Sequence, residues 1–200
     1  MKNDFVRGAR VSLRPVEPAD AWVLAACNND PDVRVSFFTH TPTTIHLQTE
    51  RIKGFYQAGS DYIPLGIWVE EQNVLIGVTA LHRVDLVSGA AVFSICIADT
   101  AWWGKGLAKE ATELMLRYAF DVLNLHRVQL HTWVGNQAGV AIYESLGFRR
   151  EGILREAMKH DGLWCDFHVM GLLEKEWRKR KPAKVLSRRK RTKGKRPNRS

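Results

Sequence analysis

Alternation of apolar and polar positions predicts a set of strands in the first half of the chain. A short strand is expected at 10–14, and two more at 65–70 and 74–81. The polar residues 71–73 join the latter two as a hairpin. Residues 91–97 read AVFSICI, which is apolar enough for a strand buried on both faces.

Segments whose composition or spacing predicts helices lie between and after these strands. Pro15 and Pro18 precede an apolar stretch at 19–27 that predicts a first helix. The segments that follow are expected as a turn at 28–31, a loop at 37–43 and a second helix at 44–57. The clearest helix follows a glycine pair, with apolar residues recurring at Leu107, Ala111, Leu114, Met115, Tyr118 and Val122.

The rest of the chain adds a strand at 126–133, a helix at 136–146 and two strands between 148 and 173. A turn is expected at Asp161-Gly162 between these two strands. This order predicts one α/β domain over residues 1–177, built on a mixed, largely antiparallel sheet flanked by helices.

Composition narrows the class of protein. With 200 residues, 45% hydrophobic and 26% charged, the chain can bury one globular core. No apolar run approaches the ~20 residues of a membrane span, and the start lacks a secretory signal. The three cysteines are odd in number and widely scattered. We therefore expect a soluble cytoplasmic protein without disulfides and without a membrane partner.

Charge is distributed unevenly. Residues 178–200 hold 13 of the 30 basic residues and none of the 21 acidic ones, so residues 1–177 carry 17 against 21, a net −4. Such a basic tail is expected to be disordered. It could contact RNA or ribosomes through counterion release, or serve only as a solubilising extension. The acidic body would attract a cationic amine, and the oligomeric state stays open.

The first candidate site is the turn Gly104-Lys105-Gly106, between the strand at 91–97 and a helix. Glycines allow close backbone approach, and the N–H groups and dipole of a helix start favour an anion. Lys105 and Lys109 add positive charge there. Taken alone, this pattern is also compatible with a tight structural turn.

The second candidate site lies on the helix at 136–146. Asn136 suits its N-cap and Gly147 its end. Asn136 and Tyr143 are seven residues apart, so both lie along one helix face. Each residue alone is compatible with a purely structural role.

Together these motifs resemble the GNAT superfamily of acyl-CoA N-acyltransferases. Residues 103–108 resemble its pyrophosphate motif, and residues 136–148 resemble its Asn/Tyr helix. The branch of ribosomal-protein N-terminal and spermidine acetyltransferases is the nearest in pattern, through Gly147-Phe148, Glu151-Gly152, Arg155, Gly162, Asp166 and Met170. The resemblance covers residues 8–177 and leaves the tail outside. It implies that the mixed, largely antiparallel sheet is splayed.

The resemblance implies that acetyl-CoA is the acyl donor and that a primary amine attacks it directly. Tyr143 would donate a proton to the leaving thiolate, and no cysteine nucleophile is needed. The residues that would bind acetyl-CoA are Ile97, Ala98, Gly104, Lys105, Gly106, Leu107, Ala108, Lys109 and Asn136. No metal is expected, because no histidine or cysteine shows ligand spacing.

The general base and the acceptor amine stay open. Phe93 or Ser94 stands where many relatives place a glutamate, and Trp103 replaces the Arg or Gln of the pyrophosphate motif. The candidate bases are His131, Asp99, His82 or a water chain. By resemblance, segments 33–40 and 158–164 would form the acceptor pocket, with Phe37, Phe38, His40 and Trp164 as lining residues.

The amine could be a protein N-terminus, for instance of a ribosomal protein, a polyamine or an aminoglycoside. The absence of a glutamate at Phe93 or Ser94, where many relatives have one, also permits a class of protein that is not an enzyme. In that alternative, the chain is a catalytically idle adaptor that binds RNA or ribosomes through its tail.

Overall fold

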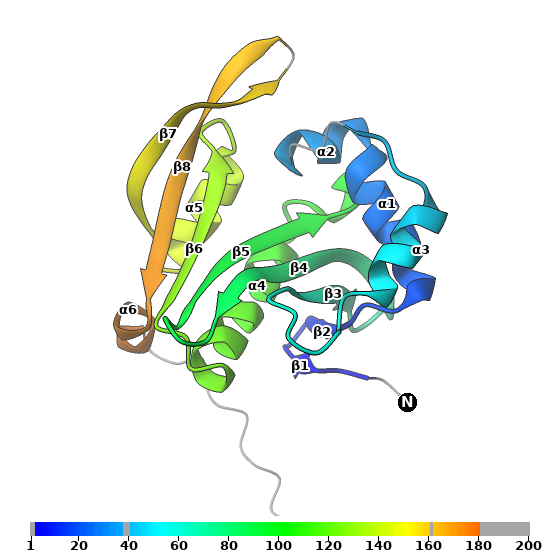
Figure 1. Cartoon of the computed structure of the whole chain (residues 1–200), viewed down its shortest axis with the longest axis horizontal. Coiled ribbons are helices and arrows are strands. Elements are labelled where there is room, and N and C mark those ends of the chain that lie inside the picture. Colours follow the sequence, from blue (N-terminus) through cyan, green and yellow to red (C-terminus); the bar gives the residue numbers. More distant parts are fainter. Residues whose placement is uncertain (1–2, 38–40, 161, 181–200) are drawn as a thin grey trace, which may run out of the picture.

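The computed structural model describes residues 3–37, 41–160 and 162–180. Within these, one eight-stranded sheet has the order β1-β2-β3-β4-β5-β6-β8-β7 (Figure 1). Neighbouring strands are antiparallel except for β5 and β6, so the predicted mixed, largely antiparallel sheet is confirmed. The strands are β1 (Val6–Arg7), β2 (Val11–Pro15), β3 (Ile63–Val69), β4 (Val74–Asp85), β5 (Ala90–Ile97), β6 (Arg127–Trp133), β7 (Arg149–His160) and β8 (Leu163–Leu173).

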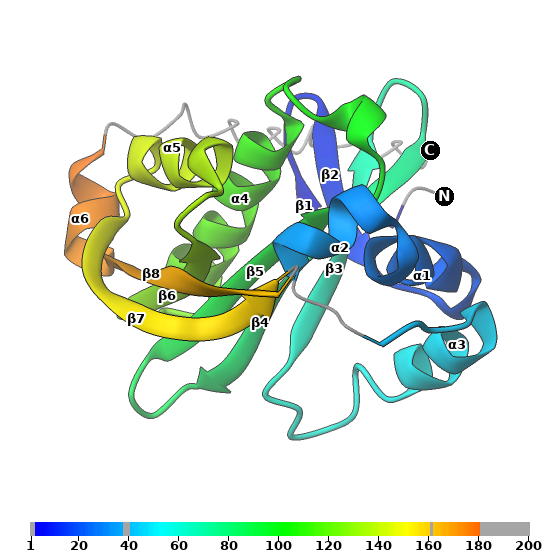
Figure 2. The same cartoon turned by 90° about the horizontal axis from the view of Figure 1, so that it is seen from above.

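Helices cover both faces of the sheet, as Figure 2 shows. They are α1 (Ala21–Asn29), α2 (Pro31–Phe37), α3 (Ile45–Lys53), α4 (Leu107–Arg117), α5 (Gln137–Ser145) and α6 (Glu174–Lys179). We call the face packed against α4 and α5 the back face, and the face packed against α1–α3 the front face. None of the described helices is long and apolar enough to cross a membrane.

Each face buries its own apolar core. Phe93 from β5 packs on the back face with Leu114 and Met115 of α4. Cys96 from the same strand packs on the front face with Leu24 of α1 and Ile52 of α3. Side chains along β5 therefore serve two cores in turn, as its apolar sequence predicted.

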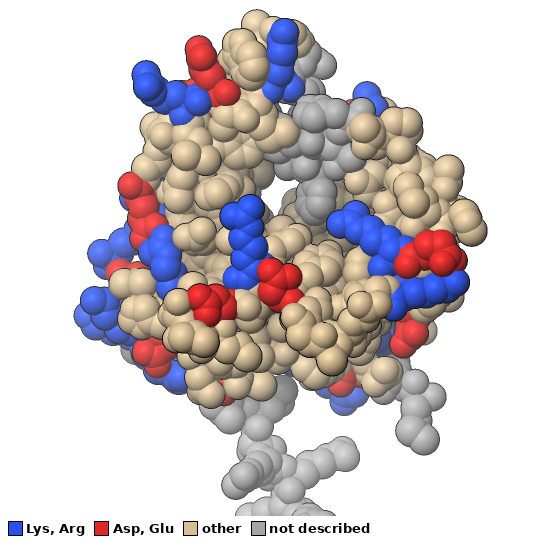
Figure 3. All heavy atoms as spheres, in the orientation of Figure 1, with Lys and Arg blue, Asp and Glu red and all other residues tan. Residues whose placement is uncertain are grey.

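The sheet splits between β5 and β6. These parallel strands pair at only three positions, from Ala90↔Arg127 to Val92↔Gln129. Beyond Val92 and Gln129 they diverge, and Figure 3 shows that side chains leave a hole between the two halves. We call the space between β5 and β6 beyond these residues the opening.

Two elements differ from their prediction for local reasons. Of the predicted turn at 28–31, Asn28 and Asn29 end α1 and Pro31 begins α2, because proline suits a first helical position. There the Asp30 carboxylate accepts the N–H groups of Asp32 and Val33. After Arg117, residues Tyr118–Val122 form a π turn, η3, which takes Val122 off the apolar face and leaves it 63% exposed.

The last described element, α6, contacts the body of the domain and was not predicted. Arg178 forms ion pairs with Glu174 and Asp121, and Arg180 donates to the Leu146 carbonyl. Residues 178–180 of the basic segment thus contact the folded domain. Its remainder, 181–200, lies outside the described residues, as do 38–40 of the predicted loop and Asp161 of the predicted turn.

Candidate active site

The glycine turn leads directly into α4. Gly104 (φ 71°) and Gly106 (φ 75°) adopt the left-handed conformation that residues with a Cβ disfavour. None of the six backbone N–H groups from Gly104 to Lys109 has a hydrogen-bond partner among the described residues. With the positive end of the helix dipole, they present a row of donors suited to an anion.

Arg10 holds this turn from the opposite side. Its Nη1 donates to the Lys105 carbonyl (2.9 Å), and its Nη2 donates to the Gly106 carbonyl (3.3 Å). In a planar trans peptide the C=O and the next N–H point in opposite directions. The N–H groups of Gly106 and Leu107 therefore point away from Arg10, toward solvent.

Glu110, in the first turn of α4, completes this attachment. Its carboxylate accepts the backbone N–H groups of Ala9 (2.7 Å) and Arg10 (2.8 Å) and the Arg10 Nε (3.0 Å). Burial raises the pKa of Glu110, but these hydrogen bonds outweigh burial and lower it. Neither residue was predicted, because Arg10 and Glu110 lie 100 positions apart and meet only in the fold.

The other residues predicted to bind acetyl-CoA near the glycine turn lie on either side of it. Ile97 and Ala98 lie buried at the end of β5, and the Ala98 N–H is already bonded to the Ile76 carbonyl (2.9 Å). The indole of Trp103 donates to the Ile97 carbonyl (3.4 Å). The Lys105 ammonium lies over the Trp102 ring, 4.9 Å from its centre, and Lys109 is exposed.

Asn136 caps α5 with its side chain. Its Oδ1 accepts the Gly139 N–H (3.0 Å), and its Nδ2 donates to the Thr132 hydroxyl (3.2 Å). An amide nitrogen carries two hydrogens, so one remains for a ligand. The predicted capping role is confirmed by this geometry, and the ligand-binding role stays a prediction.

Tyr143 lies at the base of the opening. Its ring meets the edges of Phe93 and Phe148, with centroids 6.3 and 5.9 Å away. Phe93 is the first β5 residue beyond the last β5–β6 pair, so Tyr143 contacts β5 where the strands part. Burial raises the pKa of its phenol to about 12, and among the described residues its hydroxyl has no hydrogen-bond partner.

The candidate bases lie in different surroundings. The Asp99 carboxylate accepts the Ala101 N–H (2.7 Å) and so caps a short helical turn, Thr100–Trp102. His131 is exposed on β6. The Nε2 of His82 lies 2.6 Å from the Ser94 hydroxyl.

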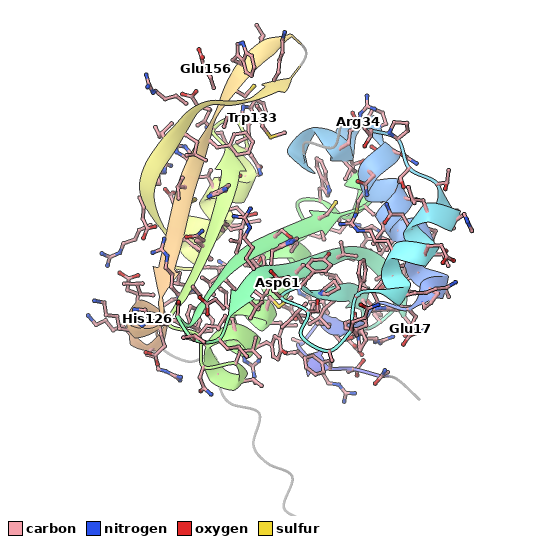
Figure 4. The ribbon with its side chains drawn as sticks, in the orientation of Figure 1. Glu17, Arg34, Asp61, His126, Trp133 and Glu156 are labelled. Carbon is pink, nitrogen blue, oxygen red and sulfur yellow. The ribbon has the colours of Figure 1, made fainter. Side chains whose placement is uncertain are left out.

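Figure 4 shows Trp133 of β6 and Arg34 of α2 on opposite sides of the opening. Of the predicted acceptor-pocket residues, Trp164 is 61% exposed on β8. Phe38, His40 and the side chain of Phe37 lie outside the described residues.

A sheet opened between two parallel strands, with a free helix start behind one of them, defines an acyltransferase-type α/β fold. A family model described as "Acetyltransferase (GNAT) domain" matches residues 10–149. The chain therefore belongs to the GNAT family of acetyl-CoA-dependent N-acetyltransferases. The family named from its motifs is confirmed.

Several characterised and uncharacterised proteins are similar over most of the chain. An uncharacterized N-acetyltransferase p20 from Bacillus licheniformis is 30% identical over 174 residues, covering 84% of this chain and 95% of the relative. The ribosomal protein uS5-alanine N-acetyltransferase of Escherichia coli is 27% identical, with 84% and 90% covered.

A solved structure of an N-acetyltransferase is also similar to this chain over most of its length. The spermidine N-acetyltransferase from Vibrio cholerae, crystallised with CoA and spermine, superposes with a TM-score of 0.78 at 26% identity, covering 85% of this chain and 99% of that one.

Proposed function

We propose that the chain moves an acetyl group from acetyl-CoA to a primary amine by direct attack in a ternary complex. One observation carries the proposal: the free N–H row from Gly104 to Lys109 and the free hydroxyl of Tyr143 belong to elements on the same, back face. The row suits the pyrophosphate, with Lys105 and Lys109 beside it. Asn136 has one amide hydrogen for the pantetheine arm, and the carbonyls of Ile97 and Ala98 border its path.

The chemistry needs one hydrogen-bond donor at the sulfur. The amine nitrogen bonds to the thioester carbon and the carbon–sulfur bond breaks. The proton that the attacking nitrogen loses neutralises the thiolate that leaves, and Tyr143 faces this thiolate. A phenol of pKa about 12 stays protonated, so it stabilises the thiolate by donating a hydrogen bond. Complete transfer of the phenol proton to the thiolate of a thiol with the ordinary pKa of ~8.5 would cost about 5 kcal/mol, at ~1.4 kcal/mol per pKa unit.

The front face favours an amine with a single positive charge. Along β6 and β8, the side chains directed to this face beside the opening carry no carboxylate among the described residues; they include Gln129, His131, Trp133, Phe167 and Val169. The Glu151 carboxylate of β7, which lies over Gly171 on this face, is already paired with Arg127. Residues 33–49, which include α2 from Val33 onward, contain no Asp or Glu, and the acidic residue of α2, Asp32, is exposed in its first turn. A polyamine would find few partners for its further charges, so a protein N-terminus is the better substrate. The relative from Escherichia coli is named for such a substrate, an alanine of a ribosomal protein.

The first test is a melting-temperature shift with acetyl-CoA, compared with adenosine diphosphate. A ligand at 100 times its Kd stabilises by about 2.7 kcal/mol. Turnover is then compared on peptides with free N-termini, on spermidine and on an aminoglycoside. Binding without turnover on every amine would overturn the proposal and favour the adaptor. The three free cysteines suit an enzyme of the cytoplasm, and the absence of a metal requirement stays a prediction.

A further inference from the structure

Of the candidate bases, His82 is the one whose ring nitrogen meets a hydroxyl, that of Ser94, on the front face. The Nε2 of His82 on β4 lies 2.6 Å from the Oγ of Ser94 on β5. The Tyr62 ring packs on the imidazole, with centroids 4.8 Å apart. Two different contacts therefore fix the orientation of His82.

The strand register directs both side chains to the front. Val78 and Cys96 are paired and pack in the front core. Successive side chains alternate between faces, so Ala80 and Ser94, the next pair but one, also face the front. His82 pairs with Val92 and shares that face.

Ser94 lies on the wall of the opening. It is two residues beyond Val92, the last β5 residue paired with β6, and it is partly exposed. A group that enters the opening from the front can therefore reach its hydroxyl, while His82 lies one strand further from the opening.

Burial and the nearby arginines keep His82 neutral at pH 7. Burial is the largest cause that lowers its pKa below the ordinary 6.5, and Arg51 of α3 and Arg83 of β4 lower it further. Asp61, which Figure 4 shows in the loop in front of β4, raises it but does not reverse the shift. Tyr62, the remaining titratable neighbour, is kept protonated because burial raises its pKa.

We propose that Ser94 and His82 form the proton path that deprotonates the acceptor ammonium, a role that rests on the proposed function. The ammonium gives a proton to the Ser94 Oγ while the Ser94 hydroxyl proton moves to His82 Nε2. The products are a neutral amine, an unchanged serine and an imidazolium. Proton removal on the front face thus complements the Tyr143 donor on the back face.

The test compares His82→Gln, Ser94→Ala and Ser94→Thr with the wild type on one peptide amine. Glutamine keeps a polar group beside Ser94 but cannot hold the proton. At pH 7 we expect kcat to fall about 10²–10⁴-fold in His82→Gln and Ser94→Ala, with Ser94→Thr close to wild type. The melting shift with acetyl-CoA stays unchanged in all three. His46→Gln, an exposed histidine on α3, is the matched control with full activity.

The pH profile separates chemistry from structure. Above the pKa of the substrate amine no base is needed, so His82→Gln should recover most of its activity there. An equal loss at every pH, or no loss at all, would overturn the role of His82. A pH-dependent loss in His131→Gln instead would assign the proton to the other side of the opening. A wild type that binds acetyl-CoA and acetylates no amine would overturn the proposed function, and the proton path with it.

Discussion

Tyr143 shows how a single residue takes its chemistry from its surroundings. Its sequence position identified a phenol on the correct helix face, but the packing of Phe93 and Phe148 sets its pKa. In Tyr143→Phe the ring remains and the hydroxyl is lost. We expect kcat to fall about 10²–10⁴-fold while the Kd of acetyl-CoA, measured by calorimetry, changes little. Unchanged turnover would remove Tyr143 from the reaction.

The pH dependence of this residue has a definite sign. A group with a pKa raised to about 12 is protonated at every lower pH, and its protonated form is the donor. The ratio of wild-type to Tyr143→Phe turnover should therefore stay constant from pH 7 to about 10. A ratio that declines by pH 9 would mean that the phenol titrates in its ordinary range.

Asn136 has a capping role and a proposed role in binding acetyl-CoA, which substitutions can separate. Ser is as good an N-cap as Asn, so Asn136→Ser should keep the melting temperature while raising the KM for acetyl-CoA. Asn136→Ala should lose about 0.5–2 kcal/mol of stability as well. Equal acetyl-CoA kinetics in wild type and Asn136→Ser would leave Asn136 with its capping role alone.

Among elements, the contact between the β1–β2 turn and the start of α4 matters most for the site. Removing the Arg10 guanidinium frees the Lys105 and Gly106 carbonyls, so the glycine turn loses its fixed orientation. Arg10→Ala should raise the KM for acetyl-CoA about tenfold, or about 1.4 kcal/mol, with kcat nearly unchanged. Arg7→Ala, which removes an ion pair with Asp4 and leaves the contacts of Arg10 intact, is the control.

The elements that sequence predicted are those whose signal is local. The glycine turn, α4, the β3–β4 hairpin and the capped helix α5 each carry their own periodicity or caps. The start of α2 was misread because Asp30-Pro31 suits a turn as well as a helix start. Arg10, Glu110 and the His82–Ser94 pair depend on strand register and tertiary packing, which periodicity does not encode. The splay of β5 from β6 likewise follows from the whole sheet.

At the scale of the molecule, the basic segment can be tested separately from catalysis. Because Arg178 and Arg180 contact the body, a truncation should retain residue 180. Deleting 181–200 removes ten basic residues and should leave turnover of a small amine unchanged. If the segment binds RNA, the full chain should show steep salt dependence, about −0.7 per neutralised phosphate on a single strand, which the truncated chain lacks. Lost turnover after truncation would contradict this separation.

In the proposed ternary complex, the two helical layers place acetyl-CoA and the acceptor amine on opposite faces of the sheet. Each ligand can arrive and depart without passing the other, and the two meet only in the opening. A single molecule that joins CoA to a peptide amine would span both faces at once. Since linked groups lose their translational freedom together, such a chimera should bind far more tightly than either half, as avidity predicts.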